Sequence, residues 1–150
     1  MKHLIPDHIL GLFKSSGLKP LQIKGREILP IVQGGMGVGV SAHKLAGAVA
    51  KLGGVGTISS IDLRRLHPDL MKKTQYLLPS DHSKAVINSA NIEALKREIQ
   101  LAKSESDGNG LIAVNVMRAV KEYTSYVECS LENVRMQLLL ERDCHWICLI

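Results

Sequence analysis

The glycine-rich segment at residues 34–39, Gly-Gly-Met-Gly-Val-Gly, has the residue types in this sequence that are best suited to binding chemistry. Glycine has no Cβ, so the backbone N–H groups of such a segment can approach a ligand closely. An apolar run precedes the segment and a helical pattern follows it, and the N-terminus of a helix favours negative charge. We therefore expect residues 34–39 to form a loop that binds an anionic ligand.

Part of this loop also matches the dinucleotide-binding pattern G-x-G-x-x-A. The match runs from Gly37 to Ala42, and Asp62 follows the next expected strand, where an acidic residue would contact a ribose. The pattern is short, and small residues also occur where a helix simply packs against a strand. A Rossmann-type nucleotide-binding module is therefore one alternative, and plain packing is another.

Alternating strand and helix patterns surround the loop. Apolar residues 28–33 predict a buried strand, and Ser41 is placed to cap a helix that Gly53 and Gly54 end. The apolar face of that helix consists of Leu45, Ala46, Val49, Ala50 and Leu52. Residues 55–60 predict a second strand, which one helix connects to the first, so the two strands should be parallel.

The alternation continues in the second half of the chain. Residues 91–103 carry apolar positions at helical spacing, residues 111–117 form a third apolar strand, and residues 119–132 predict a third helix. Residues 62–90 are polar and mixed, and we expect no chemistry from them. This order predicts an α/β fold with a parallel sheet.

Composition excludes several functional classes. The sequence has no run of about 18 apolar residues, and Pro6 and Asp7 interrupt its first apolar stretch, so we expect no membrane segment and no secretory signal. Three cysteines indicate reduced thiols and a cytoplasmic location. The net charge of +5 is spread thinly and only 3% of the residues are aromatic, so we expect no nucleic-acid partner.

Isolated histidines and one cysteine complete the candidates within the patterned region. We expect His43 to be a surface residue of its helix, His67 and His82 to be solvated, and Cys129 to be a small packing residue of its helix. None of them is expected to be catalytic.

A longer string is more specific than the short glycine pattern. Residues 30–60, PIVQGGMGVGVSAHKLAGAVAKLGGVGTISS, resemble the opening of the nitronate monooxygenase family, also called the 2-nitropropane dioxygenase family. The apolar strand at residues 113–116 carries Asn115 and is similar to the next motif of that family. The resemblance covers about residues 28–127. It implies an FMN-binding TIM barrel that oxidises alkyl nitronates with molecular oxygen, while close relatives reduce enoyl thioesters with a nicotinamide donor.

The resemblance also implies roles for individual residues. Gly34, Gly35, Met36 and Gly37 would lie against the isoalloxazine ring of FMN, at the C-terminal end of the strands, and Asn115 would offer its amide to the cofactor. A buried Asn115 bonded to neighbouring backbone, and a Met36 that only packs, are the alternatives. The family's catalytic histidine matches none of the histidines here, so no catalytic residue is assigned.

The resemblance stops after Asn133. Residues 134–150 end in C-H-W-I-C-L-I, and inserting one nucleotide into a permitted back-translation restores the family's Gly-Ala-Asp and Gly-Ala-Gly-Leu-Pro motifs. We therefore expect residues 134–150 to be an out-of-frame tail with apolar residues that lack a burial site. The cluster of Cys144, His145 and Cys148 has no partner motif, so no metal site is expected.

These observations predict residues 1–133 to be the N-terminal part of a (β/α)8 barrel, incomplete, with about three βα units and an open edge on the third strand. The expected function is that of an FMN-dependent nitronate oxidoreductase, with this chain inactive by itself. An enoyl thioester reductase, a Rossmann-type module, and a non-catalytic fragment that associates with a partner are the alternatives. The oligomeric state stays open.

Overall fold

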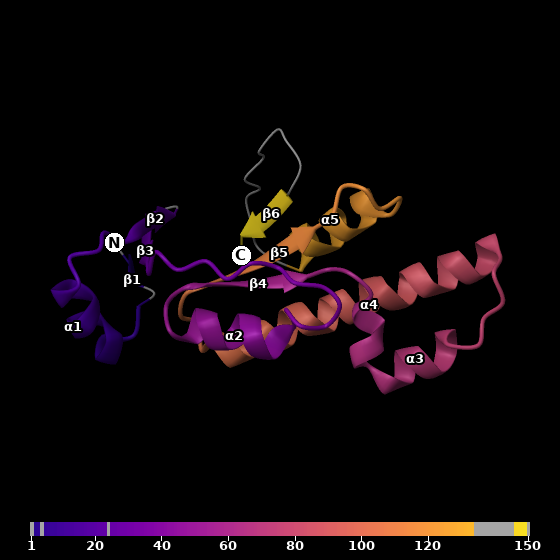
Figure 1. Ribbon diagram of the computed structural model, residues 1–150, viewed down its shortest axis with the longest axis horizontal. Helices are drawn as coiled ribbons and strands as arrows, with labels where there is room; N and C mark the ends of the chain where they lie inside the picture. Colours follow the sequence, from indigo (N-terminus) through magenta and orange to yellow (C-terminus); the bar gives the residue numbers. More distant parts are fainter. Residues whose placement is uncertain (1, 4, 24, 134–145, 150) are drawn as a thin grey trace.

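The computed structural model describes residues 2–3, 5–23, 25–133 and 146–149. A small N-terminal sheet has the strand order β1-β3-β2, in which β1 is parallel and β2 antiparallel to β3. Its elements are β1 (Lys2–His3), α1 (Asp7–Ser15), β2 (Leu21–Ile23) and β3 (Arg26–Ile28). They form the indigo end of the molecule in Figure 1.

The second sheet has the order β4-β5-β6. β4 (Val55–Ser59) and β5 (Leu111–Val116) are parallel, in a register that places Val55 beside Leu111 and Ser59 beside Asn115. All five residues of β4 are buried, as expected for a parallel strand covered on both faces. The predicted strands at residues 55–60 and 111–117 are confirmed to within one residue.

Helices cover one face of this sheet. Figure 1 shows α2 (His43–Lys51) beside the long α4 (Asp81–Ser106), with α5 (Tyr123–Glu132) farther along α4. The 3-10 helix η1 (Leu63–Leu66) and α3 (Pro68–Thr74) connect β4 to α4. The core between helices and strands contains Ala46, Ala50, Ile58, Leu95, Ile99, Ile112 and Val114.

The predicted first strand is only partly formed. β3 ends at Ile28, and the following residues run parallel to β4, with Val32 bridging Val55. The amide of Gln33 donates to the Val55 carbonyl at 2.9 Å, and the amide of Val55 donates to the Ile31 carbonyl at 2.8 Å. Parallel hydrogen bonding is therefore present, but a regular strand is not.

Helix boundaries differ from the sequence pattern. α4 begins ten residues before the predicted start at residue 91, because Ser80 caps it by accepting a 3.0 Å hydrogen bond from the amide of Ser83. The first turns of α4 project beyond the sheet, so they lack the apolar periodicity that reveals a packed helix. α5 begins at Tyr123, four residues later than predicted.

The molecule is thus mixed α/β, with parallel pairing between β4 and β5, and the described residues include no closed barrel. β6 (Trp146–Leu149) pairs antiparallel with β5, so the prediction of an open edge on that strand is wrong. The predicted out-of-frame tail otherwise falls on residues 134–145 and 150, outside the described residues. In the described part of the chain, no helix is long and apolar enough to cross a membrane.

Candidate functional site

The side chains on the sheet face opposite the helices change from apolar to polar along the strands. Side chains alternate between the two faces of a strand, so Val55, Thr57 and Ser59 share a face with Asn115 in the observed register. At the beginning of the strands this face is apolar, and residues of β2 cover it. Toward the C-terminal ends it is polar, which is where ligand sites of parallel α/β sheets lie.

The glycine loop lies over this polar end because one hydroxyl fastens it. Ser41 Oγ accepts hydrogen bonds from the amide of Met36 and from Gln33 Nε2, both at 2.8 Å, and donates to the carbonyl of Gly34 at 3.1 Å. Gln33 Oε1 in turn accepts from the amide of Thr57 at 2.9 Å. The loop is therefore tied to itself and to β4.

Ser41 was expected to cap the following helix, and that prediction is wrong. The N-cap of α2 is Ala42, which has no side-chain cap bond. The hydroxyl of Ser41 is engaged by the loop instead. The sequence pattern did not reveal the roles of Ser41 and Gln33, because both residues lie in irregular backbone.

Gly35 and Asn115 lie in contact. A Cβ placed on Gly35 would lie 2.7 Å from Asn115 Cβ and 2.8 Å from Asn115 Nδ2, so only glycine fits without displacement. The Oδ1 atom of Asn115 is buried and has no hydrogen-bond partner among the described residues. A buried amide oxygen without a partner costs free energy, so this atom is suited to a ligand that donates a hydrogen bond.

The other loop residues are more accessible. Met36 is 52% exposed, so it is not an ordinary core residue. A Cβ on Gly37 would lie 3.6 Å from Ser59 Oγ, and a Cβ on Gly34 would meet open space. In the part of the chain that the structure describes, the amides of Gly34, Gly35 and Gly37 have no hydrogen-bond partner, whereas that of Met36 is bound to Ser41.

This arrangement fits a flat ring that carries both hydrogen-bond donors and acceptors. A further hydroxyl on the same face of β4, Thr57 Oγ1, is buried without a partner in the described structure. The unpartnered amides of the loop can donate hydrogen bonds to a ligand, and the unpartnered Oδ1 of Asn115 can accept one. The residues present are compatible with the isoalloxazine of FMN.

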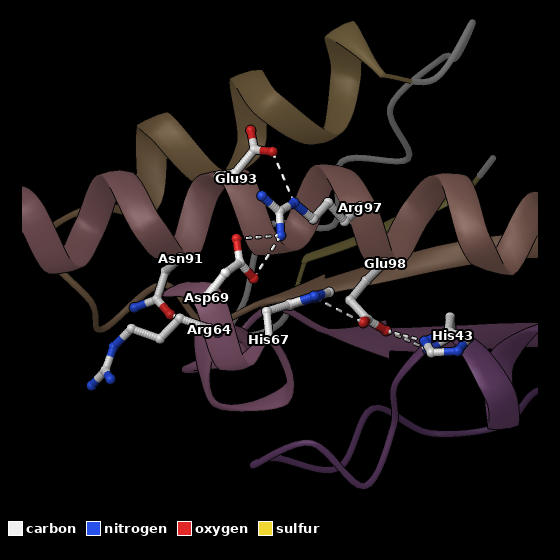
Figure 2. A network of polar contacts seen from close by, with 8 residues as sticks. All are labelled: His43, Arg64, His67, Asp69, Asn91, Glu93, Arg97 and Glu98. Atoms are coloured by element: carbon white, nitrogen blue, oxygen red, sulfur yellow. Dashed lines mark hydrogen bonds and ion pairs between the residues drawn. The ribbon is translucent and has the colours of Figure 1, made fainter. Parts of the chain in front are cut away.

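A second cluster of polar side chains lies on the helix side of the sheet. Figure 2 shows His43 and His67 converging on Glu98, a residue of α4 that is completely buried. Glu98 Oε2 accepts hydrogen bonds from the backbone amide of His43 at 2.7 Å and from His43 Nδ1 at 2.8 Å. His67 Nε2 lies 3.1 Å from Glu98 Oε1.

The prediction that His67 is solvated is therefore wrong, and His43, which was predicted to lie at the surface, is partly buried. The side chains of His43 and His67 are 26% and 13% exposed, and both lie against the same carboxylate, to which only His43 is hydrogen-bonded. The sequence did not show this cluster because Glu98 is 55 residues away from His43. His82 is exposed, as predicted.

The loop before α3 is fixed by ion pairs. Asp62 has a left-handed backbone conformation, with φ of 52°, and its Oδ1 lies 3.1 Å from Arg64 Nε, while Oδ2 pairs with Arg65. Its carboxylate therefore contacts arginines rather than standing free for a ribose. Arg97 of α4 holds α3 through Asp69, at 2.9 Å (Figure 2), and this hydrogen bond lowers the pKa of the Asp69 carboxyl.

Cys129 is buried against α4, which confirms its predicted packing role. Burial raises the pKa of its thiol, so the reactive thiolate is disfavoured. Among the residues that the structure describes, no group of histidine, cysteine, aspartate or glutamate side chains is arranged to hold a metal ion. Cys144 and His145 lie outside the described residues, as does the side chain of Cys148.

No protein-family model, curated protein or solved structure matches the chain. The functional assignment therefore depends on the sequence motifs and on the geometry of the loop and strands.

Proposed function

We propose that the chain binds FMN and is of the nitronate monooxygenase type of oxidoreductase, whose substrates are an alkyl nitronate and molecular oxygen, but that it is inactive by itself. The observation that carries this proposal is the contact between Gly35 and Asn115, which leaves Asn115 Oδ1 buried and unpartnered. The family motif supplies the identity of the cofactor, and the structure supplies residues that are compatible with it.

In this proposal the loop positions the cofactor and the strand end recognises it. The free amides of Gly34, Gly35 and Gly37 donate to acceptor atoms of the ring, and Asn115 Oδ1 accepts from a ring N–H. Ser41 and Gln33 hold the loop in the conformation that presents these amides. FMN supplies the redox chemistry when it is bound.

The proposal separates binding from turnover. None of the histidines in residues 1–133 corresponds to the catalytic base of the family, and His43 and His67 are engaged by Glu98. We therefore expect FMN binding by this chain without nitronate-dependent oxygen uptake. Stoichiometric flavin together with rapid oxygen uptake would contradict the assignment of no catalytic residue.

Variants of the two contacting residues test the cofactor site. Gly35→Ala forces the loop away from Asn115, and Asn115→Leu removes the amide, so each variant should weaken FMN binding at least about tenfold, the equivalent of about 1.4 kcal/mol. The measurement is a titration that follows quenching of FMN fluorescence.

Gly11→Ala is the matched control, because a Cβ there meets open space on α1. It should bind FMN as the unmodified chain does. Equal affinity in all four proteins would contradict the site. Binding of NAD in place of FMN would support the Rossmann-type alternative.

A further inference from the structure

A surface pocket of about 490 Å³ lies on the helix side of the sheet, beside the N-terminus of α2. Its walls are largely apolar, with Val40, Leu45, Leu66 and Leu101 contributed by four different segments. The buried Glu98 and its two histidines form its polar part. This volume lies within the range of small-molecule sites, which combine apolar walls with a few polar groups.

The two carboxylate oxygens of Glu98 differ in their hydrogen bonding. Oε2 of Glu98 is occupied by two N–H donors of His43. Oε1 lies 3.1 Å from His67 Nε2, but neither of these two atoms reaches hydrogen-bond geometry with any described residue. A fully buried carboxylate oxygen with unused capacity therefore belongs to the pocket lining.

The hydrogen bond between His43 and Glu98 also determines what the pocket offers a ligand. A carboxylate only accepts, so His43 Nδ1 is the donor in this hydrogen bond. The polar part of the pocket thus includes an acceptor, the carboxylate of Glu98. Lys44, which also lines the pocket, is exposed to solvent, where its charge is screened.

From these observations we infer that the pocket is a second binding site, distinct from the FMN site, for a small primary amine with a short apolar body. The ammonium group donates to Glu98 Oε1 and complements its charge, and the apolar body contacts Leu45, Leu66 and Leu101. An amine of four to six carbons fits the apolar part of such a volume.

The test is an NMR titration of the full chain with n-butylamine at pH 8.5, where this probe is an ammonium ion, followed on the imidazole signals of the histidines. The signals of His43 and His67 should shift saturably with a dissociation constant in the millimolar range, and that of His82 should not. n-Butyrate, which has the same length and opposite charge, should cause no saturable shift.

Two substitutions on α4 decide whether the pocket is the site. Leu101→Trp fills the pocket from a half-exposed position without altering Glu98, and should weaken binding at least about tenfold. Gln100→Trp is the matched control at the neighbouring exposed position, and should leave binding unchanged. Shifts that do not saturate, equal shifts with butyrate, or binding that survives Leu101→Trp would overturn the inference.

Discussion

At the scale of single residues, Glu98 of α4 contacts residues at the N-termini of two other helices. Its buried carboxylate accepts from the first amide of α2, which has no cap of its own, and reaches His67, the residue before α3. The negative charge also lies at the positive end of the α2 dipole. One side chain of α4 therefore binds the N-terminus of α2 and lies beside that of α3.

Replacing Glu98 by alanine should be strongly destabilising, because the amide and ring of His43 lose their acceptor in a buried place. We expect the free energy of unfolding to fall by about 2–4 kcal/mol in urea denaturation. Glu93→Ala is the control on the same helix, since its pair with Arg97 is exposed, and should cost less than about 0.5 kcal/mol. Equal losses in the two variants would contradict the role of Glu98.

Tyr126 gives the molecule a predictable response to alkali. Burial, followed by the charges of Glu122 and Asp62, raises the pKa of its hydroxyl to about 12. A pKa raised on folding stabilises the folded protein below the unfolded value of about 10, and this contribution is lost as pH rises toward 12.

The unfolding free energy should therefore fall by about 1–2 kcal/mol more between pH 9 and pH 11.5 than it does in Tyr126→Phe. Tyr76→Phe, at a side chain that is 86% exposed, should retain the full alkaline loss. Identical pH profiles for the unmodified chain and Tyr126→Phe would exclude this source of pH dependence.

At the scale of elements, the contact between α2 and β4 depends on glycine. A Cβ on Gly56 would lie 1.8 Å from the carbonyl oxygen of Ala46, so the helix could not approach the strand as it does. Gly56→Ala should destabilise the protein by at least about 3 kcal/mol in urea denaturation, because backbone must move. Loss of less than about 1 kcal/mol would show that the two elements separate easily.

The elements also show what the sequence could predict. β4 and β5 were predictable because short, continuous apolar runs between glycines are typical of buried parallel strands. The start of α4 was not predictable, because its first turns are polar and only the N-cap residue Ser80 marks them. The roles of Ser41 and Glu98 depend on contacts between irregular or distant segments, which no local pattern encodes.

At the scale of the whole molecule, the two faces of the β4–β5 sheet have different contents. The helix face is a continuous apolar core, while the opposite face is apolar at one end and polar at the other, under the glycine loop. This polarity along the strands is what the proposed cofactor site requires.

The central claim is that FMN binds against the glycine loop and the end of β5, where Gly35 and Asn115 are in contact. The most direct measurement is a proton–nitrogen NMR titration of the labelled full chain with FMN. We expect saturable shifts of the amides of Gly34, Gly35 and Gly37 and of the Asn115 side-chain amide. The amide of Gly11 should not shift. Absence of saturable shifts, or shifts confined to residues away from the loop and Asn115, would contradict it.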